Sequence, residues 1–156
     1  MTPDLAALFS PCRRYRYALW REWIDGAGTV NFIGLNPSTA DEVQDDPTIR
    51  RCVGYAKAWG FQRLCMLNLF AFRATDPKDM MAADDPIGPD NDAVLAKQVG
   101  RNDTVAAWGV GGWYRGRGQF IHDMYPQLKI LRLTKSGHPA HPLYLPASLR
   151  PVEWKK

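Results

Sequence analysis

Cysteines and long apolar segments are scarce in this sequence of 156 residues. The three cysteines, Cys12, Cys52 and Cys65, lack CxxC spacing, and two of them lie in apolar runs. This pattern excludes a disulfide framework or a zinc knuckle and predicts reduced, mostly buried thiols. No run of about eighteen apolar residues occurs, and no charged leader precedes the short apolar patch near the N-terminus. We therefore expect a cytoplasmic protein without a membrane partner.

Motifs for a cofactor or a metal ion are also lacking. The glycine-rich stretch "WGVGGWYRGRG" fits neither GxGxxG nor GxxxxGK[ST], two fingerprints of phosphate-binding loops. His138 and His141 are each followed by proline, but the sequence offers no clear third ligand for a metal. We expect no cofactor and no metal. We expect one of the two histidines to face a cleft, where an imidazole donates a hydrogen bond or carries charge near neutral pH.

The length and the 46% share of hydrophobic residues predict one domain over residues 1–156, and we expect a monomer. Charge is distributed unevenly along this chain. Residues 1–103 hold 12 Lys and Arg against 14 Asp and Glu, whereas residues 104–156 hold 8 against 2. The basic last third suits contact with a phosphate backbone or an anionic small molecule, although a solvated basic surface explains the charge equally well.

Alternating strand and helix patterns predict an α/β fold. The segment "YRYALWREW" alternates like a half-exposed strand and, with "TVNFIGL" after the "DGAG" turn, predicts an N-terminal β-hairpin. A helix is predicted in "DDPTIRRCVGYAKAWGF", where Asp46 can cap, Pro47 suits the first turn and Gly60 ends the helix. Strands are predicted in "RLCMLNLF", "DTVAAWG" and "LKILRL", and helices in "GPDNDAVLAKQVG" and "WYRGRGQFIHDMY". We expect a three-layer sandwich around a central, largely parallel four-stranded sheet.

Parallel sheets bind ligands beyond the carboxyl ends of their strands. Four segments hold such positions, and we expect them to converge on one cleft: "GLNPSTAD", "NLFAFRATDP", "WGVGGWYRGRG" and "TKSGHPAHPLYL". Asn36 and Asn68 stand where an apolar strand turns polar. Each carboxamide either reads an amide-like edge, such as O4 and N3–H of a pyrimidine, or satisfies backbone groups of its own turn.

Charged and aromatic residues near these segments are candidates for ligand contact. Asp41 is the carboxylate expected to face the cleft and orient water, with a solvated carboxylate as the alternative. Trp108, Trp113 and Tyr114 suit stacking on bases, unless the tryptophans face the core. Arg73 suits a phosphate. The residues expected to contact nucleic acid are Arg50, Arg51, Arg115, Arg117 and Lys135.

Taken in order, the four segments resemble the uracil-DNA glycosylase superfamily. "GLNP" at residues 34–37 looks like its Gly-x-(Asp/Asn)-Pro turn, which holds the catalytic water. "CMLNLFAFRA" is similar to the strand that reads the base, which places Asn68 in that role, and "VAAWGVGG" matches a third strand that ends in Trp-Gly. His138-Pro139, or His141-Pro142 with Leu143, looks like the His-Pro loop that supports the oxygen of the departing base.

The resemblance implies a uracil-DNA glycosylase-like domain and a division of roles among its residues. It assigns catalysis to Asn36, Asp41, His138 and His141. It assigns substrate binding to Gly34, Leu35, Pro37, Ser38, Asn68, Phe70, Arg73, Trp108, Gly109 and Tyr144. The whole chain also resembles an uncharacterised bacterial and phage family of domains of unknown function, through "LNPSTAD", "DDPT", "NLFA.R", "PIGP.ND" and "HPLYL" within residues 13–145.

The resulting functional hypothesis is an enzyme that cleaves the N-glycosidic bond of a modified or deaminated, uracil-like base in DNA. Water would be placed beneath the sugar carbon by Asn36, and a histidine would stabilise the base anion. Two alternatives stay open, an enzyme acting on a free nucleotide or nucleoside and a non-catalytic reader of modified bases. The expected partner is accordingly DNA, single-stranded or carrying a modified base, or a free nucleotide.

Overall fold

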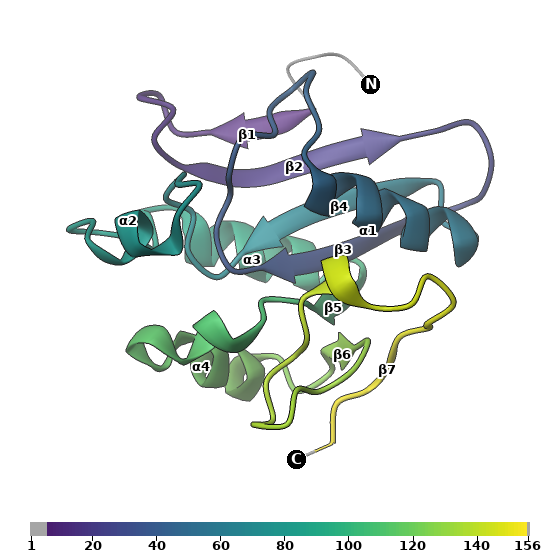
Figure 1. The fold of residues 1–156 in the computed structure, drawn as a ribbon. Helices are drawn as coiled ribbons and strands as arrows, with labels where there is room; N and C mark the ends of the chain where they lie inside the picture. Colours follow the sequence, from purple (N-terminus) through teal and green to yellow (C-terminus); the bar gives the residue numbers. More distant parts are fainter. Residues whose placement is uncertain (1–5, 156) are drawn as a thin grey trace.

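The computed structural model of the protein describes residues 6–155, and its strands form one sheet in the order β1-β2-β4-β3-β5-β6-β7 (Figure 1). The strands are β1 (Ala7–Phe9), β2 (Arg16–Glu22), β3 (Thr29–Gly34), β4 (Arg63–Asn68), β5 (Asp103–Ala106), β6 (Lys129–Ile130) and β7 (Val152–Glu153). The helices are α1 (Pro47–Ala58), α2 (Pro77–Met81), α3 (Asn91–Val99) and α4 (Arg117–Met124), with 3-10 segments η2 (Val110–Gly116) and η3 (Pro142–Tyr144). Within the described residues none of these helices has the length and apolar character needed to cross a membrane.

The middle of the sheet is parallel and its edges are antiparallel. Strands β4, β3, β5 and β6 are parallel neighbours, whereas β2 runs antiparallel to β4, β1 to β2 and β7 to β6. The predicted α/β class is therefore present, but the sheet mixes parallel and antiparallel pairs and is not largely parallel. The sheet has seven strands rather than four, because antiparallel strands extend it on both sides.

The predicted hairpin between β2 and β3 is wrong. Leu19 of β2 lies opposite Met66 of β4, and Gly34 of β3 lies opposite Asn68 of β4, so β4 separates the two strands. The physical reason is that β4 is apolar on both faces and is buried almost throughout, which favours a central position over an edge. The N-terminal hairpin that does form joins β1 to β2.

Helix α1 begins and ends where its sequence predicts. Asp46 caps it by accepting the N–H of Ile49 on Oδ1 at 2.9 Å, and Pro47 occupies the first turn, where its missing N–H costs no hydrogen bond. The helix stops before Gly60, whose φ of 87° suits glycine best. The cap places the N-terminus of α1 at the carboxyl end of β3, next to the segment that follows this strand.

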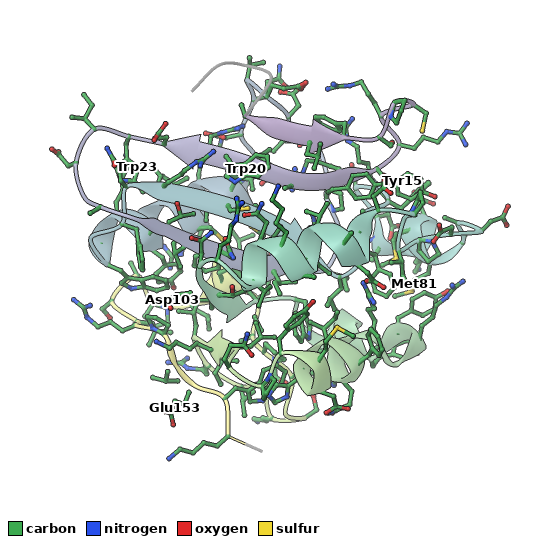
Figure 2. The ribbon with its side chains drawn as sticks, turned by 180° about the vertical axis from the view of Figure 1, so that it is seen from behind. Tyr15, Trp20, Trp23, Met81, Asp103 and Glu153 are labelled. Carbon is green, nitrogen blue, oxygen red and sulfur yellow. The ribbon has the colours of Figure 1, made fainter. Side chains whose placement is uncertain are left out.

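The core lies on both faces of the sheet. On one face, α1 and η3 cover apolar residues that include Phe32 of β3, and on the other face α2, α3 and α4 cover a second cluster that includes Leu67 of β4. In Figure 1, α1 lies in front of the sheet. Seen from behind, α3 and α4 lie over it, with Met81 and Asp103 near opposite ends of the strands (Figure 2). Both faces of the central strands are thus covered, as their apolar sequences require.

The three cysteines are free, as predicted. Cys52 and Cys65 are buried, and burial raises the pKa of both thiols, that of Cys65 to about 12. Cys12 is exposed rather than buried. Two of the thiols therefore act as small apolar side chains of the core.

Phe32 connects the sheet to α1 and is the residue with which we test this packing. Its ring stacks 5.7 Å from Trp59 and 6.4 Å from Tyr55, centroid to centroid. Phe32→Ala should lower the free energy of unfolding by about 3–5 kcal/mol, because it leaves a cavity under α1. Urea unfolding measures this, with Val43→Ala at an exposed position as the control, which should change the value by less than about 0.5 kcal/mol. Equal effects of the two variants would contradict the packing described here.

Candidate functional site

A cavity of about 480 Å³, the strand-end cavity, lies at the carboxyl ends of the parallel strands. All four predicted segments contribute to its wall: residues 34–39 after β3, Ala74 and Thr75 after β4, Trp108 after β5, and His141 and Leu143 after β6. The start of α1, one residue of β2, Met66 and Asn68 of β4 and Pro77 of α2 complete the wall. Parallel strands point their carboxyl ends to the same edge of the sheet, which is why segments far apart in sequence meet here.

The turn after β3 is held to the loop after β4 by a set of short contacts. Asn36 Nδ2 donates to the carbonyl oxygens of Ala74 at 2.8 Å and Pro37 at 3.2 Å, and the Ala74 N–H donates to Pro37 O at 2.9 Å. Ser38 Oγ and Thr75 Oγ1 lie 3.5 Å apart. The amide nitrogen of Asn36 therefore fixes the turn, while the residue still lines the cavity.

Asn68, at the end of β4, brings a buried carboxamide to the cavity. The residue is only 1% exposed, and Nδ2 has no hydrogen-bond partner among the described residues. Gly34 lies opposite in the sheet, and a Cβ at Gly34 would lie 3.5 Å from Asn68 Oδ1 and 2.9 Å from the Met66 methyl group. Glycine thus leaves the room that the methyl group of Met66 occupies beside Asn68.

Asn91 and Arg117 hold the backbone on which Asn68 stands. Asn91 Nδ2 donates to the carbonyl oxygens of Asn68 and Leu69, both at 3.1 Å, and Arg117 Nε donates to Leu69 O at 3.0 Å. Arg117 is buried and forms an ion pair with Asp92. The expectation that Arg117 contacts nucleic acid is therefore wrong, because its guanidinium is committed inside the protein. Asn91 and Asp92 are the "ND" of the "PIGPDND" stretch, and they supply these contacts to the strand end and to Arg117.

Arg16 of β2 is the residue of the site that the sequence reasoning missed. The alternating pattern of residues 15–23 predicted an exposed side chain, but Arg16 is 2% exposed because β2 lies inside the sheet between β1 and β4. Nη1 donates to Ala40 O at 3.0 Å, and Nε has no partner. Burial lowers the pKa of Arg16 to about 10, although Asp46 acts in the opposite direction. The signal available in the sequence is an arginine followed directly by "YAL", in a stretch otherwise suited to burial.

Asp46, rather than Asp41, is the carboxylate that lines the cavity. Asp41 lies outside it, and its Oδ1 accepts the N–H groups of Gln44 at 2.8 Å and Val43 at 2.9 Å, which lowers the pKa of its carboxyl group. The expectation that Asp41 faces the cleft is therefore wrong, since this carboxylate turns back onto its own backbone. Thr48, in the first turn of α1, also lines the cavity.

Of the two histidines, His141 lines the cavity and His138 does not. His141 Nδ1 accepts the N–H of Leu143 at 3.2 Å, so the neutral ring carries its proton on Nε2. Burial lowers the pKa of His141, and the carboxylate of Asp46 acts in the opposite direction. His138 instead closes a turn, in which its N–H donates to Thr134 Oγ1 at 3.1 Å.

Trp108 lines the cavity, and its indole packs closely against two glycines. A Cβ at Gly112 would lie 2.3 Å from Trp108 Cδ1, and one at Gly118 would lie 3.0 Å from its Nε1. The indole is 2% exposed, so it does not offer a free stacking face on the surface. Trp113, by contrast, is exposed, and Tyr114 donates its hydroxyl to Met81 O at 2.8 Å.

The other predicted site residues lie outside the cavity. Phe70 is buried against Tyr114, and Arg73 lies over the ring of Phe9, 4.8 Å from its centroid. Arg51 donates to backbone carbonyls of Pro142 and Leu145 and so fixes η3 to α1, which contradicts a free role in nucleic-acid contact. The remaining residues are partly or fully exposed at the surface: Gly109, Tyr144, Arg50, Arg115 and Lys135.

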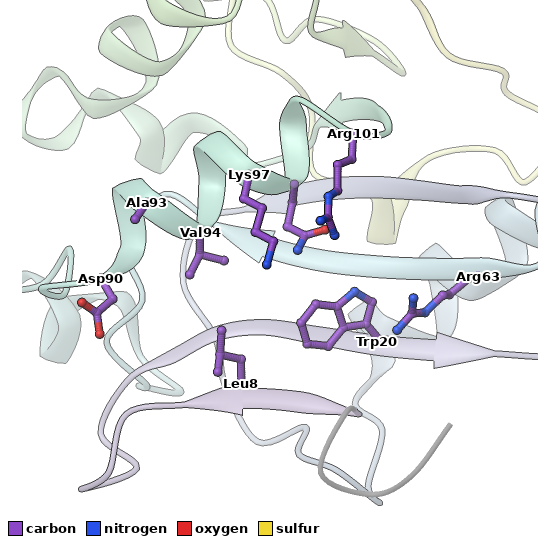
Figure 3. Close-up of a pocket in the computed structure, with 9 residues that line it drawn as sticks. Leu8, Trp20, Arg63, Asp90, Ala93, Val94, Lys97 and Arg101 are labelled. Carbon is purple, nitrogen blue, oxygen red and sulfur yellow. The ribbon is translucent and has the colours of Figure 1, made fainter.

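A second hollow of about 450 Å³, the edge cavity, lies between α3 and the strands β1, β2 and β4. Figure 3 shows Lys97 and Arg101 extending from α3 toward Trp20, with Arg63 on the other side of this ring. Lys97 stands in the last turn of α3 and Arg101 just beyond it, where cations compensate the negative end of the helix dipole. The fold thus accounts for these charges without a ligand.

The side chains of the strand-end cavity suit an uncharged or anionic ligand better than a metal ion. Within residues 6–155 no three His, Cys, Asp or Glu side chains gather closely enough to hold a metal. The cavity instead combines a buried guanidinium, a buried carboxamide, hydroxyl groups, one carboxylate and one imidazole. The guanidinium, the carboxamide and the hydroxyl groups can donate hydrogen bonds to carbonyl and oxyanion oxygens.

The lowered pKa of His141 makes the stability of the fold depend on pH. Because the pKa is lower in the folded than in the unfolded state, protonation favours unfolding, and stability should fall as the pH drops below the ordinary value of about 6.5. NMR titration of His141 should give a pKa below that value. Asp46→Asn keeps the helix cap but removes the opposing charge, and should lower the pKa of His141 further. A His141 pKa at or above the ordinary value would contradict its burial in the cavity.

Comparison with known proteins identifies a family but no characterised relative. Neither a curated protein nor a solved structure matches the chain significantly. The model of the family described as "Protein of unknown function (DUF1643)" matches residues 16–143, which include the whole strand-end cavity. The expected resemblance to a family of unknown function is confirmed by this match. The chain belongs to the DUF1643 family.

Proposed function

We propose that the strand-end cavity binds a uracil-like base and that the protein cleaves the N-glycosidic bond of this base in DNA, as uracil-DNA glycosylases do. The observation that carries the proposal is the buried carboxamide of Asn68, whose Nδ2 has no partner among the described residues. An unpaired buried amide costs stability, and a ligand that accepts its hydrogen bond removes this cost. A pyrimidine offers O4 to Nδ2 and N3–H to Oδ1.

The neighbours of Asn68 supply the other groups that the reaction needs. Water attacks C1′ of the sugar, the bond from C1′ to the base nitrogen breaks, and the electron pair leaves with the base, which then takes up a proton. The turn at Asn36 would place the water, and Asp46 would stabilise the positive charge on the sugar. His141 would donate from Nε2 to the oxygen of the base anion, which suits a neutral imidazole.

The four parallel strands in the middle of the sheet also support this proposal, because the resemblance placed the base reader and the water-holding turn at the ends of such strands. Gly34 and Asn68 are paired residues of β3 and β4, so the turn and the reader are adjacent. The glycosylase-like fold, the substrate and the DNA partner belong to this proposal.

A second candidate is an enzyme that hydrolyses the same bond in a free nucleotide. It is favoured by the commitment of Arg51 and Arg117 to carbonyl groups and a carboxylate within the protein. Fewer of the expected cations are then left to bind a DNA backbone. This enzyme would use the same cavity and the same reading of the base by Asn68.

The test is incubation with end-labelled oligonucleotides, single- and double-stranded, each holding one uracil, hypoxanthine, xanthine or hydroxymethyluracil, followed by alkaline cleavage. We expect strand scission at one modified base, and Asn68→Asp should abolish it or change the preferred base. Asn102→Asp is the control, because this amide lies at the opposite end of the parallel strands, where it donates to Asn31 Oδ1 at 3.3 Å. Activity like that of the wild type in folded Asn68→Asp protein would refute the assignment.

A further inference from the structure

Within residues 6–155, the buried guanidinium of Arg16 has no carboxylate within ion-pair distance. Three other arginines do have such a carboxylate, Arg13 with Glu42, Arg21 with Asp45 and Arg117 with Asp92. Arg16 is 2% exposed, yet its side chain makes one hydrogen bond, from Nη1 to Ala40 O at 3.0 Å. A buried charge left in this state destabilises a protein, and a bound anion would offset this cost.

Arg16 lines a concave site and keeps an unpaired donor. Nε has no partner, and the residue lines the strand-end cavity together with Pro47, Thr48 and Ile49 of α1. These residues form the first turn of a helix of 12 residues, whose dipole places partial positive charge at this end. Pro47 has no N–H and Asp46 accepts that of Ile49, so the first turn offers the N–H of Thr48 and the helix dipole beside the guanidinium of Arg16. Such a pair of groups suits an anionic oxygen group.

We propose that Arg16 and the first turn of α1 bind a phosphate group of the ligand. This inference deepens the proposed function and rests on it for the identity of the base, since Asn68 would bind the base while Arg16 binds the phosphate of the same nucleotide. The planar fork of Arg16 suits two phosphate oxygens at once. The phosphate belongs either to a free nucleotide or to a DNA strand, and the two sources share this chemistry.

The carboxylate of Asp46 should weaken phosphate binding at this site by electrostatic repulsion. Its Oδ1 accepts the N–H of Ile49, and its carboxylate faces the same cavity as Arg16 without forming an ion pair with it. A phosphate bound at the first turn of α1 would lie near this negative charge. We therefore expect the affinity of the site for phosphate to be lower than Arg16 alone would give.

The binding test compares three ligands at constant ionic strength: deoxyuridine 5′-monophosphate, deoxyuridine and inorganic phosphate. Isothermal titration gives each Kd, and thermal unfolding gives each shift in Tm. Arg16→Met should weaken binding of the monophosphate about 10- to 100-fold and leave that of deoxyuridine unchanged. The same variant should unfold at or above the wild-type Tm without ligand, because it removes a buried charge. Equal loss for both ligands, or no loss for the monophosphate, would overturn the proposal.

Two further variants control this measurement. Arg101→Met removes an arginine of the edge cavity (Figure 3) and should leave monophosphate binding unchanged, whereas a loss equal to that of Arg16→Met would place the phosphate elsewhere and overturn the proposal. Asp46→Asn should tighten monophosphate binding about 3- to 10-fold, since it keeps an N-cap and removes a like charge. If Arg16→Met does not fold, Asp46→Asn decides alone, and unchanged or weaker binding overturns the proposal.

A fourth ligand, an oligonucleotide that carries uracil, distinguishes the two possible sources of the phosphate. If Arg16→Met weakens binding of this oligonucleotide as much as that of the monophosphate, the phosphate comes from a strand. If only the monophosphate is affected, it comes from a free nucleotide. Phosphate binding that depends on Arg16 in a protein without strand scission would support the site and refute the glycosylase. Strand scission that is unchanged in Arg16→Met, with unchanged monophosphate binding, would refute the site alone.

Discussion

The parallel pairing of β3 with β4 is the constraint on which the candidate site depends. Its register sets Gly34 opposite Asn68, so the turn that begins at Leu35 and the carboxamide of Asn68 leave the sheet side by side. A shift of one residue would move the side chain of Asn68 to the other face of the sheet. Asn91 of α3 and Arg117 of α4 donate hydrogen bonds to carbonyl groups at this strand end, those of Asn68 and Leu69. These bonds keep the carboxamide of Asn68 in place.

Two buried donors belong to residues that line this cavity. Asn68 Nδ2 and Arg16 Nε both lack partners, and both residues line the same hollow. The buried amide of Asn31, by contrast, is paired with Gln98 O at 2.8 Å and Thr104 Oγ1 at 3.0 Å. The edge cavity has comparable volume, and two of its cations, Lys97 and Arg101, compensate a helix C-terminus. The two donors of the strand-end cavity, together with its place at the carboxyl ends of the parallel strands, favour it as the site.

The roles expected from sequence were most accurate where one strand or helix determines them. The apolar run ending at Asn68 predicted a covered strand with a polar end, and the Asp46-Pro47 pair predicted the start of α1; the structure has both. The expected roles were least accurate where contacts between residues far apart in the sequence determine the position of a side chain. Asp41 turns onto its own backbone, and Arg117 is held inside the protein by Asp92 and the carbonyl group of Leu69. Arg16 is buried in a strand whose two flanking strands no local pattern predicts.

The sequence by itself determined the central strands, the helix that follows β3, and the four polar segments at strand ends, because periodicity and capping are properties of neighbouring residues. Only the tertiary structure decided that β4 separates β2 from β3, that seven strands join one sheet, and that Arg16 faces the cavity. Strand order depends on which apolar faces bury one another across long sequence separations. Many residues of the core contribute to the free energy of that burial, so no single position in the sequence predicts the strand order.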